Sequence, residues 1–345
     1  MVKTAVVILN WNGLSFLKMF LGNVVSKSAG DETVIFVADN GSEDGSCEWI
    51  EKNHQDVSII RLDKNHGFAG GYNLALSGID ARYFVLLNSD IEVTEGWLQP
   101  LIEYMDDNPD VASCQPKILS WNNRDSFEYA GAAGGFLDKF GYPLCRGRVL
   151  SHVEKDAGQY DSLIDIFWSS GACMAVRSDI WKKCGGFDAD FFAHMEEIDL
   201  CWRFHRLGYR VSFIPQSSVY HVGGGTLPYN SPFKTYLNFR NSIYLLYKNL
   251  PDNNFSSRMF FRKVLDGIAA LFFLLKGDPK SFSAVWKAHK DARRCKDQLR
   301  GKREIIKTTG NNEPSKLFVN KSIVFEFYIR RHKTFTSMKT KLSSL

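Results

Sequence analysis

The sequence predicts an α/β fold, in which a mostly parallel sheet carries helices on both faces and a helical extension follows. Short apolar runs rich in β-branched residues alternate with helical patterns through the first half of the chain, and this alternation is typical of parallel sheets. From Phe233 onward the apolar spacing is helical. We therefore expect one α/β domain over residues 1–230 and a helical, basic C-terminal extension over residues 231–345.

Each expected element follows from its own apolar pattern. The expected strands of the first half cover residues 5–9, 34–38, 58–62 and 83–87, and the helices between them cover residues 14–25, 47–53 and 71–79. Further on, an apolar stretch at 167–176 and a strand-like run at 210–214 flank a helix that begins at Glu196 and closes at Gly208. The helical patterns of the extension cover residues 236–250, 257–275 and 281–299.

Polar or glycine-rich residues follow each of the four expected strands of the first half. One such segment is an ordinary loop, but four in register indicate a binding edge, because ligands of open α/β sheets sit beyond the carboxyl ends of the strands. The four segments are Asn10-Trp11-Asn12-Gly13, Asp39-Asn40-Gly41-Ser42, Asn65-His66-Gly67-Phe68-Ala69-Gly70-Gly71 and Asn88-Ser89-Asp90.

Two adjacent carboxylates, Glu196 and Glu197, open the helix that closes at Gly208. A helix N-terminus favours ionised carboxylates, because its unpaired N–H groups carry partial positive charge. A carboxylate fixed there can accept a proton from a bound hydroxyl. Acidic first turns are also common in helices with no catalytic role, so the pair alone leaves both interpretations open. Asp199 and Arg203 lie four residues apart and are expected to support each other on the helix surface.

Charge is distributed unevenly along the chain. Residues 276–345 carry 18 Lys/Arg and 6 Asp/Glu, although the whole chain has 43 and 38, so an acidic body precedes a basic tail. The seven cysteines are scattered, with no C-x-x-C pair, which indicates reduced thiols in a cytoplasmic setting and no disulfide framework or zinc site. The apolar runs at 4–9 and 267–275 are too short for a signal peptide or a membrane span.

In their order along the chain, these motifs resemble those of inverting glycosyltransferases of family 2, and most closely the bacterial rhamnosyltransferase-like branch that builds cell-surface polysaccharide. The resemblance covers residues 4–245 and includes NWN, DNGS, NxGFAGGxN, LLNxD, SGAxMxVR, GGFDxxFF, EExDLCxR, HxxGG and FRN. It implies a GT-A nucleotide-diphospho-sugar transferase fold, with a Rossmann-like mixed, mostly parallel sheet. Two residues depart from the pattern: Ser89 replaces the branch's usual proline, and Glu197 replaces the family's usual aspartate.

The resemblance also implies a donor site and a divalent metal, Mn²⁺ or Mg²⁺. Asp39 would bind the base and ribose of the donor nucleotide, and Asp90 would hold the metal beside the diphosphate, because hard cations prefer oxygen ligands. His221 matches the family's second metal ligand or a diphosphate contact. Arg240 would clamp the leaving diphosphate, since guanidinium suits phosphate geometry. The other donor-binding residues implied by the resemblance are Asn10, Asn12, Asn65, Gly67, Gly70, Gly71 and Asn88.

Glu197 is the expected general base, and Glu196 is the second choice. The expected reaction moves a sugar from dTDP-rhamnose or a UDP-sugar to a hydroxyl of a glycan or a lipid-linked acceptor, with inversion. A glycoside hydrolase also uses paired carboxylates, but it has no need for a nucleotide-binding edge. A non-catalytic sugar-nucleotide-binding or scaffold protein is the other alternative, and such a protein would not need Glu196 and Glu197.

The basic tail is expected to attach the cytoplasmic protein peripherally to the inner face of the membrane. Its net charge, together with the apolar residues upstream at 264–275, suits the surface of an anionic bilayer. A helical appendage that packs on the catalytic domain or makes a dimer has the same sequence features, so the oligomeric state stays open. No nucleic-acid-binding module is recognisable, and we expect no nucleic-acid partner.

Overall fold

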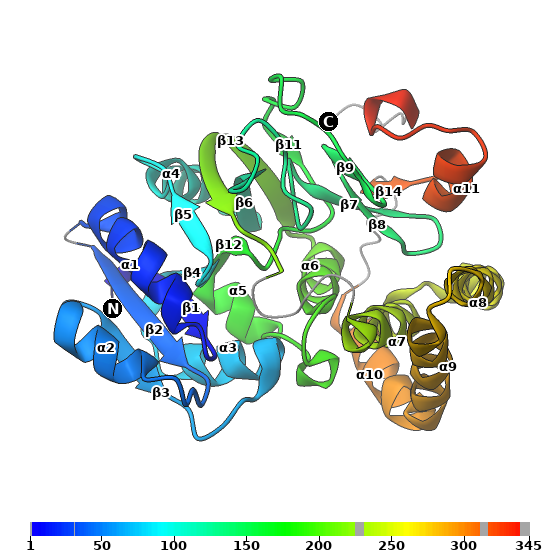
Figure 1. Cartoon of the computed structure of the whole chain (residues 1–345), viewed down its shortest axis with the longest axis horizontal. Coiled ribbons are helices and arrows are strands. Elements are labelled where there is room, and N and C mark those ends of the chain that lie inside the picture. Colours follow the sequence, from blue (N-terminus) through cyan, green and yellow to red (C-terminus); the bar gives the residue numbers. More distant parts are fainter. Residues whose placement is uncertain (1, 31, 225–230, 311–316, 339–345) are drawn as a thin grey trace.

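The computed structural model describes residues 2–30, 32–224, 231–310 and 317–338. Its parts are a large mixed sheet with helices on both faces, a small second sheet, and a group of long helices that follows them (Figure 1). The predicted α/β fold with a helical C-terminal region is therefore confirmed.

The large sheet contains nine strands, and its parallel part is the part that the sequence predicts. Strand β1 (Val2–Asn10) lies between β2 (Thr33–Asp39) and β4 (Ala81–Asn88), and β3 (Ser58–Arg61) extends this parallel set beyond β2. Strand β12 (Cys173–Arg177) runs antiparallel to β4 and makes the sheet mixed. The strands beyond it are β6 (Val111–Ser120), β13 (Arg210–His221), β11 (Ile164–Asp165) and β5 (Ile91–Val93), of which β5 pairs with β13.

Successive side chains of the central strand enter two different hydrophobic cores, because strand side chains alternate between the faces of a sheet. Ala5 and Val7 of β1 belong to one core, and Val6 and Ile8 belong to the other. The first core includes buried residues of α3 (Gly67–Ser77), α5 (Ser178–Lys183) and α6 (Glu196–Arg206). The second includes residues of α1 (Leu14–Ser28), α2 (Ser46–Asn53) and α4 (Gln99–Asp107).

The sheet register brings the polar strand ends to one edge, as predicted. Asn10 is the Cα partner of Asp39, and its neighbour Leu9 is the partner of Asn88. Asp39 also pairs with Arg61 at the end of β3. The three loops that follow β1, β2 and β4 therefore begin side by side.

Helix α3 begins earlier than the pattern predicts. The expected helix covers residues 71–79, whereas α3 starts at Gly67 and ends at Ser77. Gly67 has a φ of 72°, which glycine adopts without a side-chain clash, and the N–H groups of Phe68 and Ala69 donate to the carbonyl of Phe192 at 2.7 and 3.1 Å. Gly70 and Gly71 consequently lie within the first turns of the helix and not ahead of it.

Residues 121–165, for which the sequence shows no pattern, form most of a second sheet of five strands. Its strands are β7 (Gly135–Asp138), β8 (Pro143–Cys145), β9 (Arg148–Val149), β10 (His152–Val153) and β14 (Phe318–Val319). Strand β14 comes from the C-terminal region and runs parallel to β7. The backbone N–H of Ile323, just beyond β14, donates to the carboxylate of Asp138 at 3.0 Å. The end of the described chain thus completes a sheet that begins in the middle of the sequence.

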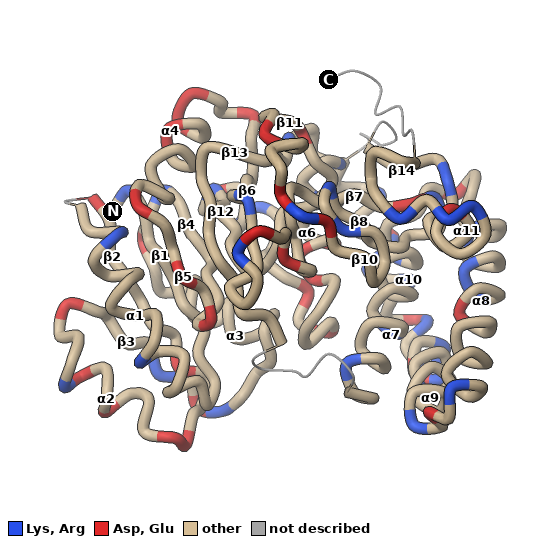
Figure 2. The backbone as a smooth tube through the Cα atoms, turned by 45° about the horizontal axis from the view of Figure 1, so that its top comes forward, with Lys and Arg blue, Asp and Glu red and all other residues tan. Residues whose placement is uncertain are grey.

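The C-terminal region is helical, and its first helix, α7, contacts the first turn of α6 through the ion pair of Lys248 with Asp199. Its helices are α7 (Pro232–Asn249), α8 (Asp252–Leu275), α9 (Pro279–Arg294), α10 (Lys296–Thr309) and α11 (Ile323–Tyr328). The single helix predicted over residues 281–299 is two helices, because the chain bends at Cys295. Lys and Arg residues are prominent along this region (Figure 2). Within the described ranges, no helix is both long and apolar enough to cross a membrane.

Candidate active site

Asp39 and Asn10 meet at the carboxyl edge of the large sheet. Asn10 Nδ2 donates to Asp39 Oδ1 at 3.1 Å, and the Ser42 N–H donates to Asp39 Oδ2 at 3.0 Å. Both side chains are almost fully buried, and Asn10 Oδ1 has no hydrogen-bond partner although it is buried. A buried acceptor without a partner is costly, so this corner has an unused acceptor for a ligand donor.

The loops around this corner are held by side-chain hydrogen bonds. Asn12, at a φ of 50°, accepts from the Glu43 N–H through its Oδ1 at 2.9 Å. Asn65 Oδ1 accepts from the Gly67 N–H at 2.8 Å and from Asn40 Nδ2 at 3.2 Å. Asn12 and Asn65 therefore fix the loops that frame Asp39.

Gly67 and Gly71 occupy positions where a side chain would collide with neighbouring side chains. A Cβ on Gly67 would lie 2.5 Å from the ring of Phe192, and one on Gly71 would lie 2.9 Å from Leu9. A Cβ on Gly70 would meet only the side chain of His66, at 3.1 Å. These glycines let α3 approach the strand ends and the loop of Phe192.

Asp90, His221 and Glu128 form a buried row at the end of β4 and β13. His221 Nε2 lies 3.1 Å from Asp90 Oδ1, and His221 Nδ1 lies 3.3 Å from Glu128 Oε2. Asn88 Nδ2 lies 3.4 Å from the same Nε2. Burial lowers the pKa of His221, but the two carboxylates outweigh burial and raise that pKa to about 10. Burial likewise opposes ionisation of Asp90, and the His221 charge outweighs it, so the pKa of Asp90 is lowered.

This row fits a divalent cation that is bound together with a phosphate ligand. Asp90 presents a carboxylate, which suits Mn²⁺ or Mg²⁺, and His221 presents an imidazole at the same corner. An imidazole binds a metal only in its neutral form, so the cation would take the place of the proton on Nε2. Glu128 faces the other ring nitrogen, as the outer carboxylate does in a carboxylate–histidine–metal arrangement. In the described part of the chain, no three His, Cys, Asp or Glu side chains converge as a complete metal cage. The remaining ligands would be phosphate oxygens and water, as is common for Mg²⁺.

Glu196 and Glu197 begin α6, directly after a strained loop. Phe192, His194 and Met195 all have positive φ, between 65° and 75°, a region that residues with a Cβ rarely adopt. Buried oxygens of both glutamates, the Oε2 atoms, have no hydrogen-bond partner. The strained loop therefore delivers two carboxyl groups with free acceptor atoms to the start of a helix.

The two glutamates differ in exposure. Glu196 is only 3% exposed, whereas Glu197 is half-buried. Burial raises the pKa of Glu197 to about 7, although backbone N–H groups at the helix start oppose the shift. Burial and the neighbouring Glu197 charge raise the pKa of Glu196 well above its ordinary value. Glu197 can therefore exchange a proton near neutral pH, while the pKa of Glu196 is shifted in the same direction by deeper burial.

Asn241 and Arg240 of α7 hold the strained loop from behind. Asn241 is fully buried, and its Nδ2 lies within 2.9 Å of the carbonyl oxygens of Phe191, Ala193 and His194. Arg240 Nη2 donates to the carbonyls of Asp190 and Phe191, each at 2.9 Å. The structure thus directs donor atoms of Arg240 to the loop that precedes the base.

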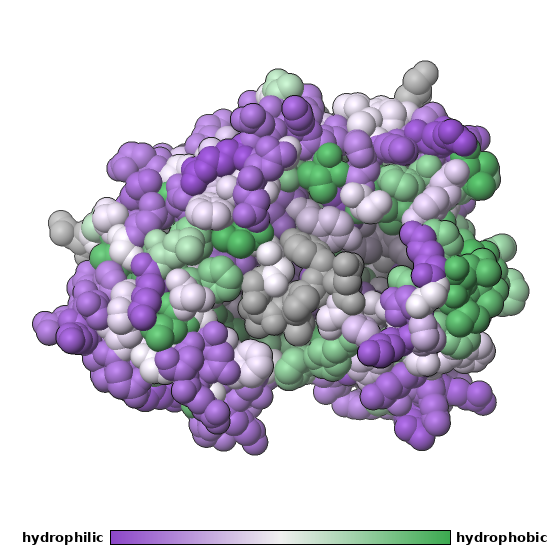
Figure 3. All heavy atoms as spheres, viewed as in Figure 1, coloured by the Kyte–Doolittle hydropathy of each residue, from purple (hydrophilic) through white to green (hydrophobic). Residues whose placement is uncertain are grey.

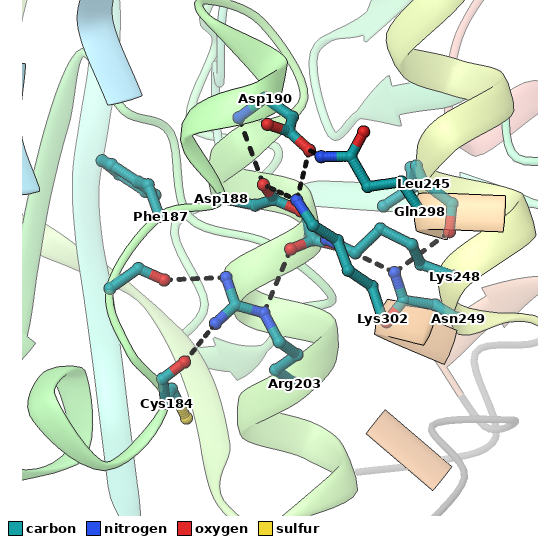
Figure 4. Close-up of polar contacts among 12 residues, drawn as sticks. Cys184, Phe187, Asp188, Asp190, Arg203, Leu245, Lys248, Asn249, Gln298 and Lys302 are labelled. Atoms are coloured by element: carbon teal, nitrogen blue, oxygen red, sulfur yellow. Dashed lines mark hydrogen bonds and ion pairs between the residues drawn. The ribbon is translucent and has the colours of Figure 1, made fainter. Parts of the chain in front are cut away.

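A network of ions connects α6 to the helical region (Figure 4). Lys248 of α7 lies 2.5 Å from Asp188 and 2.9 Å from Asp199, and Lys302 of α10 reaches both Asp188 and Asp190. Burial opposes ionisation of Asp188, but the two lysines outweigh it and lower the pKa of this carboxyl. Asp199 also pairs with Arg203 at 3.0 Å, as its spacing predicts. The first turn of α6 is therefore joined to α7 through Asp199, and α10 is joined to the Asp188–Asp190 turn that precedes α6.

A short chain of contacts links the base to the polar strand ends. A Cβ added to Gly171 would lie 3.9 Å from Glu197 Cβ and 3.2 Å from the ring of Phe68, so Gly171 packs closely against both residues. The carbonyl of the next residue, Ala172, accepts from the Asn88 N–H at 2.9 Å. The general-base candidate and the end of β4 thus lie on either side of the Gly171-Ala172 segment.

Comparison with known proteins identifies the family. The model of a family described as glycosyl transferase family 2 matches residues 5–185, which is more than half of the chain. This chain belongs to glycosyl transferase family 2. The match ends before Glu196, so the base, His221 and Arg240 lie outside it.

Two relatives of this family 2 chain come from Mycobacterium tuberculosis. The chain is 26% identical over 188 residues to a pre-mycofactocin glycosyltransferase, covering 52% of this chain and 36% of that protein. It is 23% identical over 205 residues to an N-acetylglucosaminyl-diphospho-decaprenol L-rhamnosyltransferase, covering 54% of this chain and 66% of that protein. The matched part thus spans about a third of the first relative's length and just under two thirds of the second's.

A solved structure confirms the GT-A type of fold. The structure of GalNAc-T7 with UDP, GalNAc and Mn²⁺ superposes with a TM-score of 0.56 at 16% identity, covering 72% of this chain and 48% of that protein. At this identity the likeness concerns the fold alone.

Three residues of this family 2 chain contribute to the site without a signal in the sequence analysis. Glu128 stands alone in a loop, and Lys302 lies on a helix with four other basic residues, Lys296, Arg300, Arg303 and Lys307. Asn241 adjoins Arg240 in the FRN motif, which is the one signal that could have drawn attention to it. All three act over long sequence separations.

Proposed function

We propose that this chain transfers a sugar from a nucleotide-diphosphate donor to an acceptor hydroxyl with inversion at the anomeric carbon. The observation that carries the proposal is the position of Glu197. Its Oε2 has no hydrogen-bond partner and its Cβ lies beside Gly171, while the next residue, Ala172, accepts from the Asn88 N–H at the end of β4. A base near neutral pH beside a nucleotide edge suits glycosyl transfer. Membership of family 2 supports the same reaction class.

The donor would lie along the carboxyl edge of the sheet. Asp39 and Asn10 would receive the nucleoside, since both are buried at the ends of adjacent strands and Asn10 Oδ1 lacks a partner. The loops that carry Asn12 and Asn65 would frame it. Gly67, Gly70 and Gly71 would let the start of α3 approach the diphosphate, because a helix N-terminus favours an anion.

Asp90 and His221 would hold Mn²⁺ or Mg²⁺ next to the diphosphate, with Asn88 alongside. When bound, a cation of this kind supplies charge neutralisation to the departing phosphate oxygens. Glu128 would keep the His221 ring oriented toward the cation, because it faces the opposite ring nitrogen. For Arg240, the observed contacts with Asp190 and Phe191 favour support of the base loop over the diphosphate clamp that the sequence suggested.

The reaction would proceed by direct displacement. The acceptor oxygen attacks the anomeric carbon while Glu197 takes the hydroxyl proton, and the bond from that carbon to the diphosphate oxygen breaks on the opposite face. Glu196 would not take the proton itself, because it is only 3% exposed. The strained loop fixes where the proton acceptor stands.

The donor and acceptor classes are proposed from the relatives' names and the motif pattern. A rhamnosyltransferase that acts on a lipid-linked N-acetylglucosamine appears among the relatives, which supports dTDP-rhamnose or a UDP-sugar as donor. A glycan or lipid-linked acceptor would place the reaction in cell-surface polysaccharide synthesis, at the inner face of the membrane.

The test begins with a donor screen by calorimetry against dTDP-, UDP- and GDP-sugars, with and without Mn²⁺. The anomeric configuration of the product is then read by NMR. Glu197→Gln should lower the rate of transfer by about two to four orders of magnitude, with donor affinity kept. Glu196→Gln, which changes a buried carboxyl group, should stay active. If both variants stay active, neither glutamate is the general base and the proposed mechanism fails. If the donor binds and no transfer occurs with any acceptor, the chain is a sugar-nucleotide-binding protein and the proposed function fails.

A further inference from the structure

Helix α8 has the reverse of the usual arrangement of polar and apolar faces. Its buried residues include Arg262 and Asp266, which are 3% and 0% exposed. Its outward side carries large apolar side chains, among them Ile268 and Leu271 at 57% and 56% exposed. A helix at a protein–water boundary normally shows the opposite pattern.

The inward charges of α8 are fully engaged with the rest of the protein. Arg262 Nε donates to Asp266 Oδ1 at 2.8 Å, and the hydroxyl of Tyr142 donates to the same oxygen at 3.1 Å. His289 of α9 lies 3.1 Å from Asp266 Oδ2, and the Arg262 guanidinium lies 4.0 Å from the centre of the Tyr142 ring. These contacts fix the rotation of α8, because turning the helix would strand a buried ion pair. The apolar side therefore faces outward by construction.

The outward residues form a continuous apolar surface. They recur at helical spacing along α8 and are joined by one tryptophan of α9. Figure 3 shows this surface as the large hydrophobic area over α8 at one end of the molecule. We call it the α8 surface, and its residues are Phe260, Phe261, Val264, Ile268, Leu271, Phe272, Leu274, Leu275 and Trp286.

Basic residues surround the α8 surface, and free carboxylates do not. Lys263, Lys276, Lys280 and Lys287 are exposed on α8, on α9 and between them. Of the carboxylates in the same stretch, Asp266 is buried in its ion pair with Arg262. Asp278 caps α9 through the Ser281 N–H at 2.9 Å and Asp291 accepts from Tyr236 at 3.0 Å, so both keep their charge but are outnumbered by the four exposed lysines. The rim is thus positively charged.

We propose that the α8 surface is a membrane-docking surface, on which α8 lies in the plane of an anionic bilayer. The apolar side chains would enter the boundary between headgroups and acyl chains, and the lysines of the rim would contact anionic headgroups. A second copy of this chain fits less well, since a two-fold contact would set each lysine-rich rim against its own copy. Spanning is not the mode, because α8 is not apolar enough along its length.

This inference places the expected membrane attachment on α8, whose residues 264–275 the sequence analysis joined to the basic tail. It rests on the proposed function in one respect: a lipid-linked acceptor gives the protein a reason to bind the membrane. Binding to vesicles without donor or acceptor tests the docking alone, and transfer to a soluble acceptor tests the reaction alone.

The experiment is co-sedimentation of the full chain with vesicles of phosphatidylcholine, with and without phosphatidylglycerol. Binding should increase with the anionic lipid and fall with added salt. The double variant Ile268→Glu/Leu271→Glu should lose about tenfold or more in partitioning, because two apolar side chains no longer enter the bilayer. The matched control is Met19→Glu, which changes a residue of α1 with a similar exposure of 55% and should bind as the parent does.

Folding and self-association are checked in the same samples. Circular dichroism should show parent-like melting for the double variant, whose altered residues are exposed. Lys276→Glu/Lys280→Glu should reduce binding only to the anionic vesicles. Retention of the parent protein in the supernatant at low salt would overturn the proposal. A parent dimer that the double variant converts to monomer by light scattering, without vesicle binding, would assign the surface to a second copy.

Discussion

Glu196 and Glu197 are adjacent in the chain, yet the fold gives them different proton affinities. Glu196, the first residue of α6, is buried, while Glu197 is half-buried and has an oxygen without a hydrogen-bond partner. Two carboxyls whose pKa values are pushed apart by their surroundings commonly have separate roles in catalysis. Here the more accessible group, with a pKa of about 7, is suited to accept a proton.

The pH dependence of transfer should report Glu197. A general base works when it is deprotonated, so the rate constant should rise as the pH increases through about 7 and level off above it. The measurement is the rate of transfer against pH at saturating donor. Glu197→Gln should remove the rise, whereas a midpoint near the ordinary glutamate value in the parent would contradict the raised pKa.

Glu196 should make the fold less stable at high pH. Its pKa is raised in the folded state, so its contribution to stability is complete below the ordinary value of 4.5 and is lost as the pH rises toward the folded pKa. Glutamine keeps the shape and cannot ionise. The Tm of Glu196→Gln minus that of the parent should therefore grow as the pH rises above 4.5 toward the folded pKa. A difference that does not change with pH would show that Glu196 ionises freely in the folded protein.

Glu128 should act on the metal through His221 alone. Glu128→Gln removes the carboxylate 3.3 Å from His221 Nδ1, and loss of such an outer partner commonly weakens metal binding by about 10–100-fold. Electron paramagnetic resonance of Mn²⁺ in the presence of UDP measures this directly. Glu154→Gln, the same change at a buried carboxylate that accepts from Tyr160, is the control. Equal Mn²⁺ affinity in both variants would remove Glu128 from the site.

At the scale of elements, α7 acts as a brace for the loop that precedes α6. Three residues with positive φ, Phe192, His194 and Met195, lie within four positions and are unfavourable in isolation. One asparagine side chain of α7 lies within hydrogen-bonding distance of three carbonyls of that loop. The brace is specific, since it stabilises carbonyl positions that a regular helix would not present.

Replacing this asparagine should loosen the loop and slow the reaction. Asn241→Leu keeps the volume and leaves buried carbonyls without donors, which should lower the free energy of unfolding by about 2–4 kcal/mol. Chemical denaturation measures the stability, and steady-state kinetics should show a lower kcat with nearly unchanged donor affinity. Asn238→Leu on the same helix, where the side chain is partly exposed, should have little effect on either. An unchanged kcat in Asn241→Leu would show that the loop holds its geometry unaided.

Elements with a local pattern were predictable, and elements fixed by distant contacts were not. The strands β1, β2 and β4 read directly from their apolar runs, and the polar residues at their ends identified the edge. The early start of α3 could not be predicted, because the N–H groups of Phe68 and Ala69 donate to the carbonyl of Phe192, which lies far away in sequence. The bend at Cys295 likewise interrupts a pattern that continues through it.

At the scale of the whole molecule, the site is assembled from segments that are distant in sequence. The position of Glu197 after an aromatic turn suggested its role, and Asp90 followed from its place after a strand. Neither Glu128 nor Lys302 has a local pattern, since each acts only through a partner brought to it by the fold. Strand β14 is two residues long and pairs with a sheet that had no sequence signal of its own.

The ion pairs between α10 and the Asp188–Asp190 turn before α6 should make the C-terminal region necessary for activity. A chain ending at Arg294 lacks Lys302 and Gln298, so Asp188 and Asp190 lose partners. We expect a lower Tm and loss of transfer. A chain ending at Met338 keeps every described contact and should match the parent in both measurements. Full activity in the shorter chain would show that α7 alone is sufficient.

The position of Lys302 also sets an order of events during protein synthesis. The strands of the proposed donor edge are all within the first 88 residues, whereas the ion network around α6 needs Lys302. A ribosome that adds about 5–20 residues per second reaches Lys302 on the order of 5–20 s after it has passed Glu197. In a nascent chain the proposed nucleotide edge can therefore form before the contacts of Lys302 near α6, so donor binding could precede catalytic competence.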